Sequence, residues 1–189
     1  MKDQELTKIA QEIASCQSCP LFKTAHQAVP GEGNPKAKIV FVGEAPGARE
    51  DQQGIPFCGA AGKLLGKLFE KINLKRKEVF ITNLVKHRPP GNRHPQALEI
   101  KACAPFLKKQ LLTIRPKIVV TLGRLAMNFF LPGEFISKIH GQPREIIWQN
   151  LKLIIIPLYH PAAALRSSRL LHQLTKDFLI LILTLEVRS

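Results

Sequence analysis

The chain has 189 residues, 45% of them hydrophobic, and a formal net charge of +14. This length supports one sizeable core and is short for two independent domains, so we expect a single domain over residues 1–189. The apolar run 178–183 is far shorter than the roughly 20 residues that a membrane-spanning helix needs, which argues against a membrane protein.

The positive charge is concentrated in the middle of the chain. Residues 71–124 hold thirteen Lys or Arg and two acidic residues, whereas basic and acidic residues balance in residues 1–70. Such a cluster is typical of polyanion binders, because Lys and Arg displace the counterions around nucleic-acid phosphates. The alternative is a solvated basic surface without a specific partner.

The first residues and the cysteines indicate the cellular compartment. Residues 1–5 read MKDQE and lack the basic and apolar regions of a secretory signal peptide. Four cysteines in such a chain favour a reducing environment, so we expect a cytoplasmic protein.

Hydrophobic spacing predicts alternating helices and strands. Leu6, Ile9, Ala10 and Ile13 recur at helical spacing and predict an opening amphipathic helix. Buried strands are predicted at 38–42, 79–85, 118–122 and 151–156, and further helices at 60–72, 95–114, 124–130 and 169–185. Residues 31–34 and 89–95 are expected to be loops. This alternation predicts a parallel sheet covered by helices on both faces.

Polar residues gather just after the predicted strands, where open parallel sheets bind ligands. The glycine-rich segments 43–51 and 54–62 follow the first strand, but they are acidic and lack the sequence signatures of nucleotide-phosphate loops. Residues after three of the strands can converge on one cleft. These are Glu44, Glu50, Phe57, Asn83 and His160.

Three motifs carry a family resemblance. GEAPGAREDQQGIPF from Gly43, TNLVKHRPPGNR from Thr82 and HPAAALR from His160 resemble the family 4 uracil-DNA glycosylases, the iron–sulfur branch of their superfamily. The resemblance covers nearly the whole chain and implies a three-layer α/β/α sandwich with a short central parallel sheet. It also implies a monofunctional enzyme that hydrolyses the N-glycosidic bond of uracil in DNA and starts base-excision repair.

The resemblance implies a pocket for a flipped-out base, because uracil inside a duplex cannot be reached. Phe57 would stack on the base, and Glu44 and Ala45 would line the pocket. The Asn83 carboxamide can accept from uracil N3–H and donate to O4, whereas cytosine presents the opposite pattern. We therefore expect Asn83 to select uracil, since a site whose polar groups stay unpaired rejects the wrong base.

Bond cleavage leaves positive charge on the sugar and negative charge on uracil, so catalysis should be largely electrostatic. By the resemblance, His160 reaches uracil O2 and stabilises the leaving anion. Glu50 lies near the sugar, where it could orient water or stabilise the cationic centre. How Glu50 and Glu44 divide these roles stays open.

The resemblance also implies DNA contacts outside the pocket. Leu165 and Arg166 belong to a loop that enters DNA in related enzymes, and Lys86, Arg88 and Arg93 are expected to contact phosphates. Simpler structural alternatives exist for single residues. Asn83 could cap a turn, and His160 could be a hydrogen-bonded structural histidine.

Three cysteines and one histidine form a candidate metal site. Cys16 and Cys19 form a C-x2-C pair, and His87 and Cys103 bracket the proline-rich basic segment. Three cysteines and a histidine are also a zinc ligand set, and only the resemblance favours a [4Fe–4S] cluster over zinc. Most family members have cysteine where this chain has His87. Three readings stay open, namely ligation by His87, a labile cluster and an empty site.

Other features bear on turnover and partners. The segment 89–95 is short and lacks the basic insertion through which a related branch traps DNA covalently. We therefore expect an enzyme that releases its product and turns over. The alternatives are a noncatalytic metal-cluster DNA-binding protein of the same fold, and a glycosylase retuned to another deaminated base. We expect a monomer whose partners are uracil-containing DNA and other repair or replication proteins.

Overall fold

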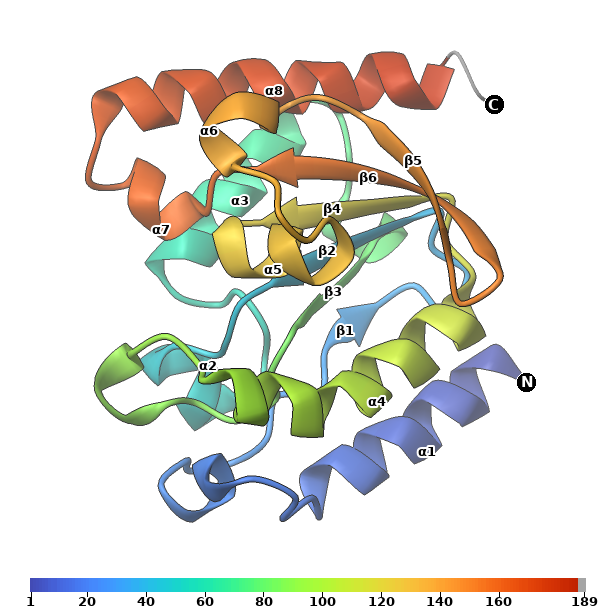
Figure 1. The fold of residues 1–189 in the computed structure, drawn as a ribbon, viewed down its shortest axis with the longest axis vertical. Coiled ribbons are helices and arrows are strands. Elements are labelled where there is room, and N and C mark those ends of the chain that lie inside the picture. The colour runs from blue at the N-terminus through green and yellow to red at the C-terminus, as the bar shows by residue number, and fades with distance from the viewer. Residues whose placement is uncertain (187–189) are drawn as a thin grey trace.

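The computed structural model describes residues 1–186 and is built around a six-stranded sheet (Figure 1). The strand order is β1-β3-β2-β4-β6-β5. The strands are β1 (Glu32–Gly33), β2 (Ile39–Gly43), β3 (Phe80–Asn83), β4 (Ile118–Leu122), β5 (Arg144–Trp148) and β6 (Leu151–Leu158). The four inner strands pair in parallel, as predicted, and β1 and β5 add antiparallel edges that the sequence did not predict.

Helices cover both faces of the sheet and complete the predicted α/β/α layers. The longer ones are α1 (Lys2–Ala14), α3 (Ala60–Lys71), α4 (Ala97–Ile114), α5 (Arg124–Phe130) and α8 (Ser168–Glu186). The short ones are η1 (Pro20–Lys23), α2 (Ala48–Gln53), η2 (Arg76–Glu78), η3 (Pro90–Asn92), α6 (Ile136–Ile139) and α7 (Pro161–Ala164). Within residues 1–186, none of the helices is both long and apolar enough to span a bilayer. The last three residues of the expected domain, 187–189, lie outside the described part of the chain.

The two faces of the sheet form two apolar cores. Successive side chains of a strand point to opposite faces. Phe41 of β2 packs against Phe69 of α3 and Phe178 of α8, with ring centroids 4.9 and 6.1 Å apart. Val40 and Val42 face the other way, into the core formed with α4 and α5. Burial on both faces explains why the inner strands are continuous apolar runs.

The edge strand β5 pairs with β6 through a tight hairpin. Trp148 pairs with Leu151, and the two residues between them, Gln149 and Asn150, have φ of 50° and 63°. Positive φ at both central residues is what a type I′ hairpin turn requires. The β5 side chains are partly or fully exposed, so this strand lacks the continuous apolar run that identified the inner strands.

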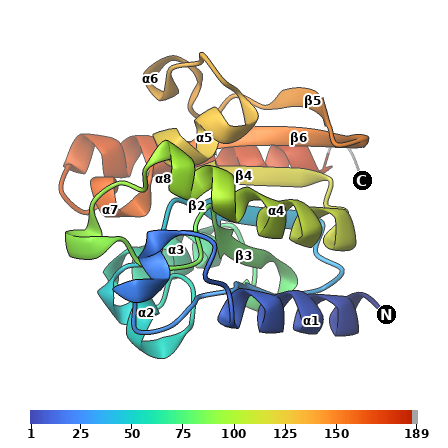
Figure 2. The same cartoon turned by 60° about the horizontal axis from the view of Figure 1, so that its bottom comes forward.

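The opening helix α1 packs along α4 and carries Cys16 and Cys19 toward the rest of the molecule. Ile9 and Ile13 are buried, as expected from their helical spacing. At the start of α1, the Lys2 ammonium donates to the Ile114 carbonyl at 2.7 Å. The chain after α1, including η1, then lies beside α2 (Figure 2), where the His26 backbone N–H donates to Asp51 at 2.9 Å.

Candidate active site and metal-binding residues

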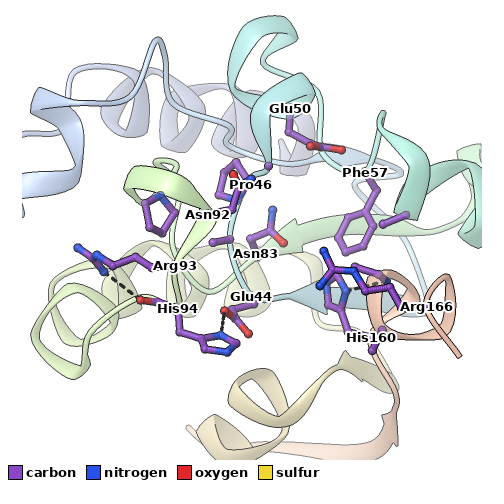
Figure 3. Close-up of a pocket in the computed structure, with 16 residues that line it drawn as sticks. Glu44, Pro46, Glu50, Phe57, Asn83, Asn92, Arg93, His94, His160 and Arg166 are labelled. Atoms are coloured by element: carbon purple, nitrogen blue, oxygen red, sulfur yellow. Dashed lines mark hydrogen bonds and ion pairs between the residues drawn. The ribbon is translucent and has the colours of Figure 1, made fainter. Parts of the chain in front are cut away.

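A cavity of about 490 Å³ lies at the carboxyl ends of the inner parallel strands (Figure 3). The chain leaves β2, β3 and β6 here, so residues far apart in sequence meet at one edge of the sheet. The structure brings together all six residues expected to form a pocket. They are Glu44, Ala45, Glu50, Phe57, Asn83 and His160.

Phe57 forms an apolar wall of the cavity in an unusual backbone conformation. Its φ is 50°, a left-handed value that a bulky side chain adopts only when its surroundings enforce it. The Arg76 guanidinium donates to the carbonyl oxygens of Pro56 at 2.5 Å and of Phe57 at 3.5 Å. Arg76 is itself paired with Glu32 at 2.8 Å. These contacts hold the Phe57 ring 5.7 Å from the His160 ring, with 30° between the ring planes.

Asn83 ends β3 and presents its carboxamide to the cavity. It is 1% exposed, and its backbone is in register with Gly43 of β2. Its Oδ1 atom is buried and has no hydrogen-bond partner among the described residues. An unpaired buried acceptor is costly, so Oδ1 marks a position where a ligand donor would be stabilised.

His160 precedes α7, and its imidazole is fixed in one tautomer. The backbone N–H of Ala162 donates to Nδ1 of His160 at 3.1 Å. A neutral imidazole whose Nδ1 accepts carries its proton on Nε2. Burial lowers the pKa of His160 to about 4, against the opposing effect of the Glu50 charge. At neutral pH, His160 therefore offers the cavity an uncharged Nε2–H donor.

The two carboxylates of the cavity are held by different contacts. Glu50, on α2, accepts a hydrogen bond from the Gly59 backbone N–H at 2.7 Å. Glu44, just after β2, contacts Nδ1 of His94 through Oε1 at 2.5 Å (Figure 3). The sequence did not predict His94 as a pocket residue. It directly follows the motif that ends at Arg93, but no residue pattern distinguishes it from a solvated loop histidine.

The expected DNA contacts lie in different environments. Arg93 and Arg166 line the cavity, and Leu165 is 52% exposed next to it. Arg93 is engaged by Glu99, with Nη2 2.7 Å from Oε1. Arg88 lies outside the cavity lining and donates to Asn92 at 2.7 Å.

The structure contradicts the expectation that Lys86 contacts a DNA phosphate. Its side chain is 1% exposed, and its Nζ donates to three acceptors inside the protein. Burial lowers the pKa of Lys86 to about 8. A phosphate on the surface cannot reach an ammonium that is buried and fully paired, so Lys86 is not a DNA contact in this fold.

The four candidate metal ligands come from the segment after α1, the loop after β3 and the helix α4. Cys16 and His87 line a second cavity of about 290 Å³. Cys19 packs against the small apolar cluster that contains Cys103. Burial raises the pKa of the Cys103 thiol and outweighs the charge and the backbone hydrogen bond of Lys86, which lower it; Cys19 and Cys16 add smaller rises.

The donor set fits a metal group that binds thiolates and neutral imidazole. His87 is 7% exposed, and burial lowers its pKa, which favours the neutral form that a metal requires. Within residues 1–186, no three His, Cys, Asp or Glu side chains are close enough to hold one ion. Four ligands that each lie ~2.3 Å from one zinc ion would stand closer to one another than these side chains do.

The fold and the cavity match a known superfamily. Residues 30–182 match the family model described as Uracil DNA glycosylase superfamily. The type-4 uracil-DNA glycosylase of Sulfurisphaera tokodaii is 49% identical over 179 residues, which cover 92% of this chain and 81% of that protein. The type-4 enzyme of Saccharolobus solfataricus is 48% identical, and the match covers 92% of this chain and 83% of that protein. The type-4 enzyme of Archaeoglobus fulgidus is 46% identical, and the match covers 93% of this chain and 90% of that protein. The chain belongs to the type-4 uracil-DNA glycosylases, which confirms the family indicated by the three motifs.

Proposed function

We propose that this chain excises uracil from DNA by hydrolysing the N-glycosidic bond and thereby starts base-excision repair. The observation that carries the proposal is the buried, unpaired Oδ1 of Asn83 in a cavity walled by Phe57. Uracil N3–H is a donor of the kind that this oxygen lacks, and the carboxamide nitrogen can donate to O4. Cytosine has an acceptor at N3, so it would leave Oδ1 unpaired and be rejected.

The leaving group is stabilised by His160 in this proposal. As the C1′–N1 bond breaks, its electron pair moves onto uracil, and the negative charge spreads to O2. The Nε2–H of neutral His160 donates to that oxygen without first needing a proton from solvent. A preorganised donor of this kind costs no reorganisation during the reaction.

The carboxylates act on the sugar side. Glu44 and Glu50 both line the cavity, where either negative charge stabilises the cationic sugar and either oxygen can orient the attacking water. The water oxygen then bonds to C1′, and its proton passes to a carboxylate. Ala45 completes the pocket wall without adding a competing polar group.

DNA binding is assigned to the residues around the mouth of the cavity. Arg166 and Arg93 line it, and the exposed Leu165 stands where a wedge could replace the flipped nucleotide in the stack. Arg88 extends the basic surface beside them. These side chains would position the duplex through phosphate contacts while the cavity reads the base.

We also infer that Cys16, Cys19, His87 and Cys103 hold a [4Fe–4S] cluster. Each ligand of such a cluster binds a different iron, so the donors stand farther apart than around one zinc ion. When bound, the cluster would tie the opening segment to the basic segment near DNA, as a structural element. Iron and zinc counts and a visible spectrum of fresh protein test this, and a colourless zinc protein would contradict it.

The glycosylase proposal is tested with uracil-containing and control oligonucleotides, followed by alkaline strand scission. We expect scission only at uracil. Binding without uracil-dependent scission would favour a noncatalytic DNA-binding protein. Scission at hypoxanthine or xanthine instead would indicate a pocket retuned to another deaminated base.

We further propose a cellular compartment and an oligomeric state for the enzyme. None of the four cysteines, all within the described residues, forms a disulfide, which suits a cytoplasmic protein in a reducing environment. We propose that it acts as a single-domain monomer alongside other repair or replication proteins. Size-exclusion chromatography with light scattering tests the monomer.

A further inference from the structure

Lys86 is a buried cation for which neither the catalytic site nor the DNA surface has a use. Its Nζ lies 2.6 Å from Thr82 Oγ1, 2.8 Å from the Asn83 carbonyl oxygen and 2.9 Å from Gln110 Oε1. An ammonium has three N–H donors and no acceptor. Three acceptors converge on it here, so every donor is paired. The pocket for this side chain is built for a protonated amine.

One of the three acceptors belongs to the backbone of the base-reading residue. The peptide group between Asn83 and Leu84 is held at both ends. Its N–H donates to the Gly43 carbonyl at 3.0 Å, and its C=O accepts from Lys86 at 2.8 Å. A peptide plane fixed on both sides fixes the direction in which the Asn83 side chain leaves the strand.

The other two acceptors connect Lys86 to the rest of the fold. Thr82 Oγ1 donates to the Pro30 carbonyl at 3.0 Å, and Gln110 Nε2 donates to the same carbonyl at 2.7 Å. The network therefore joins the end of β3, the helix α4 and the segment before β1. Its members are buried or nearly so, and a buried network of this kind rigidifies when it is fully satisfied.

We propose that Lys86 is the positioning residue for uracil selection. It fixes the peptide of Asn83 and, through it, the carboxamide that reads the base. This inference rests on the proposed function of Asn83. A neutral side chain of similar length cannot supply three donors, so the Asn83 carbonyl would be left buried and unpaired, and Gln110 Oε1 would keep only the Thr82 hydroxyl at 3.2 Å. The end of β3 would then shift to satisfy them.

The test is Lys86→Met, measured with uracil DNA as substrate, free uracil as inhibitor and undamaged duplex as a binding control. We expect kcat/KM on uracil DNA to fall by about 10²-fold, the cost of a ~1 Å misplacement in an active site. We expect inhibition by free uracil to weaken as well, whereas affinity for undamaged duplex stays within about 2-fold, because Lys86 does not touch DNA. Free uracil contacts only the pocket, so it separates base reading from DNA binding.

Matched variants separate positioning from other effects. Lys108→Met removes an exposed lysine from α4, and Ile114→Ala destabilises α4 without touching the network. Neither should weaken inhibition by free uracil. Because Lys86 adjoins His87, proteins are compared at equal iron-to-protein ratio. Gln110→Met removes one acceptor and should show a smaller loss of the same kind, which keeps the test open if Lys86→Met does not fold.

Two results would overturn the inference. One is wild-type inhibition by free uracil in Lys86→Met, or in Gln110→Met where the first variant does not fold. The other is an equal loss of uracil inhibition in Ile114→Ala. A wild-type protein inactive on every uracil substrate would instead refute the proposed function, so the two failures are distinguishable.

Discussion

Gly43 leaves the space into which the Asn83 carboxamide extends. The two residues are in register on the neighbouring strands β2 and β3. A β-carbon on Gly43 would collide with Oδ1 of Asn83 and would lie 2.6 Å from Cζ of Phe57. The missing side chain at position 43 thus lets the Asn83 carboxamide and the Phe57 ring approach each other across the strand end.

Gly43→Ala should therefore damage base recognition. The added methyl group must displace Asn83, Phe57 or both, so we expect kcat/KM on uracil DNA to fall by about 10²-fold. Steady-state kinetics measure this. Gly66→Ala is the control, because a β-carbon there meets nothing within 4 Å. It should keep full activity and stabilise α3 by about 0.5–1 kcal/mol.

Asn83→Asp should abolish uracil excision or weaken discrimination against cytosine. An aspartate has no N–H to donate to O4, and its charge faces the leaving anion. Excision from oligonucleotides containing uracil or cytosine checks this result. Asn73→Asp makes the same change in an exposed turn and should leave selectivity intact. Unchanged selectivity in Asn83→Asp would contradict the assigned role.

The buried imidazole of His160 should make stability depend on acid pH. Its folded pKa of about 4 lies below the ordinary value of 6.5. Between these values the unfolded chain binds more protons, so this contribution is complete above pH ~6.5 and is lost as pH falls toward ~4. The unfolding free energy of the wild type should fall between pH 7 and pH 5. We expect His160→Gln to make this fall smaller by about 2 kcal/mol.

Urea titrations of wild type and variant at both pH values measure that difference. The matched control is His172→Gln, since His172 is exposed on α8, and it should leave the pH dependence as it is. A His160→Gln protein with the wild-type pH dependence would show that His160 does not titrate as proposed.

Arg76→Ala should release the strained backbone of Phe57. The guanidinium holds the two carbonyls around a left-handed residue whose conformation costs about 1–3 kcal/mol. Without it, the ring should leave its position beside His160, and inhibition by free uracil should weaken by about tenfold. Lys77→Ala, the neighbouring exposed position, should leave inhibition unchanged. Equal inhibition in Arg76→Ala would show that other contacts hold Phe57.

His87→Cys should make the cluster more persistent and lower its reduction potential. A thiolate adds negative charge to the iron, whereas imidazole raises the potential of iron–sulfur centres. Redox titration and iron-to-protein ratios after exposure to a chelator measure both effects. His87→Ala should lose iron faster than wild type. Identical iron retention in all three proteins would show that His87 is not a ligand.

The sequence alone determined the inner sheet, the long helices and the family. Continuous apolar runs mark strands buried on both faces, and these were predicted within about two residues, as was the helix α5. The edge strands escaped prediction because their side chains are partly exposed. The motif residues Glu44, Phe57, Asn83 and His160 could be placed in one cleft because parallel strands end at the same edge of a sheet.

Only the tertiary structure decided what surrounds each polar side chain. Lys86 reads in sequence as one more cation in a basic segment, yet β3 and α4 enclose it and three acceptors pair with its ammonium. His94 reads as a loop residue, yet it contacts Glu44 across a sequence distance of 50 residues. Charge and motif are properties of the chain, whereas burial and pairing depend on contacts between distant segments. The fold therefore decides that Lys86 is enclosed whereas Arg166 lines the cavity.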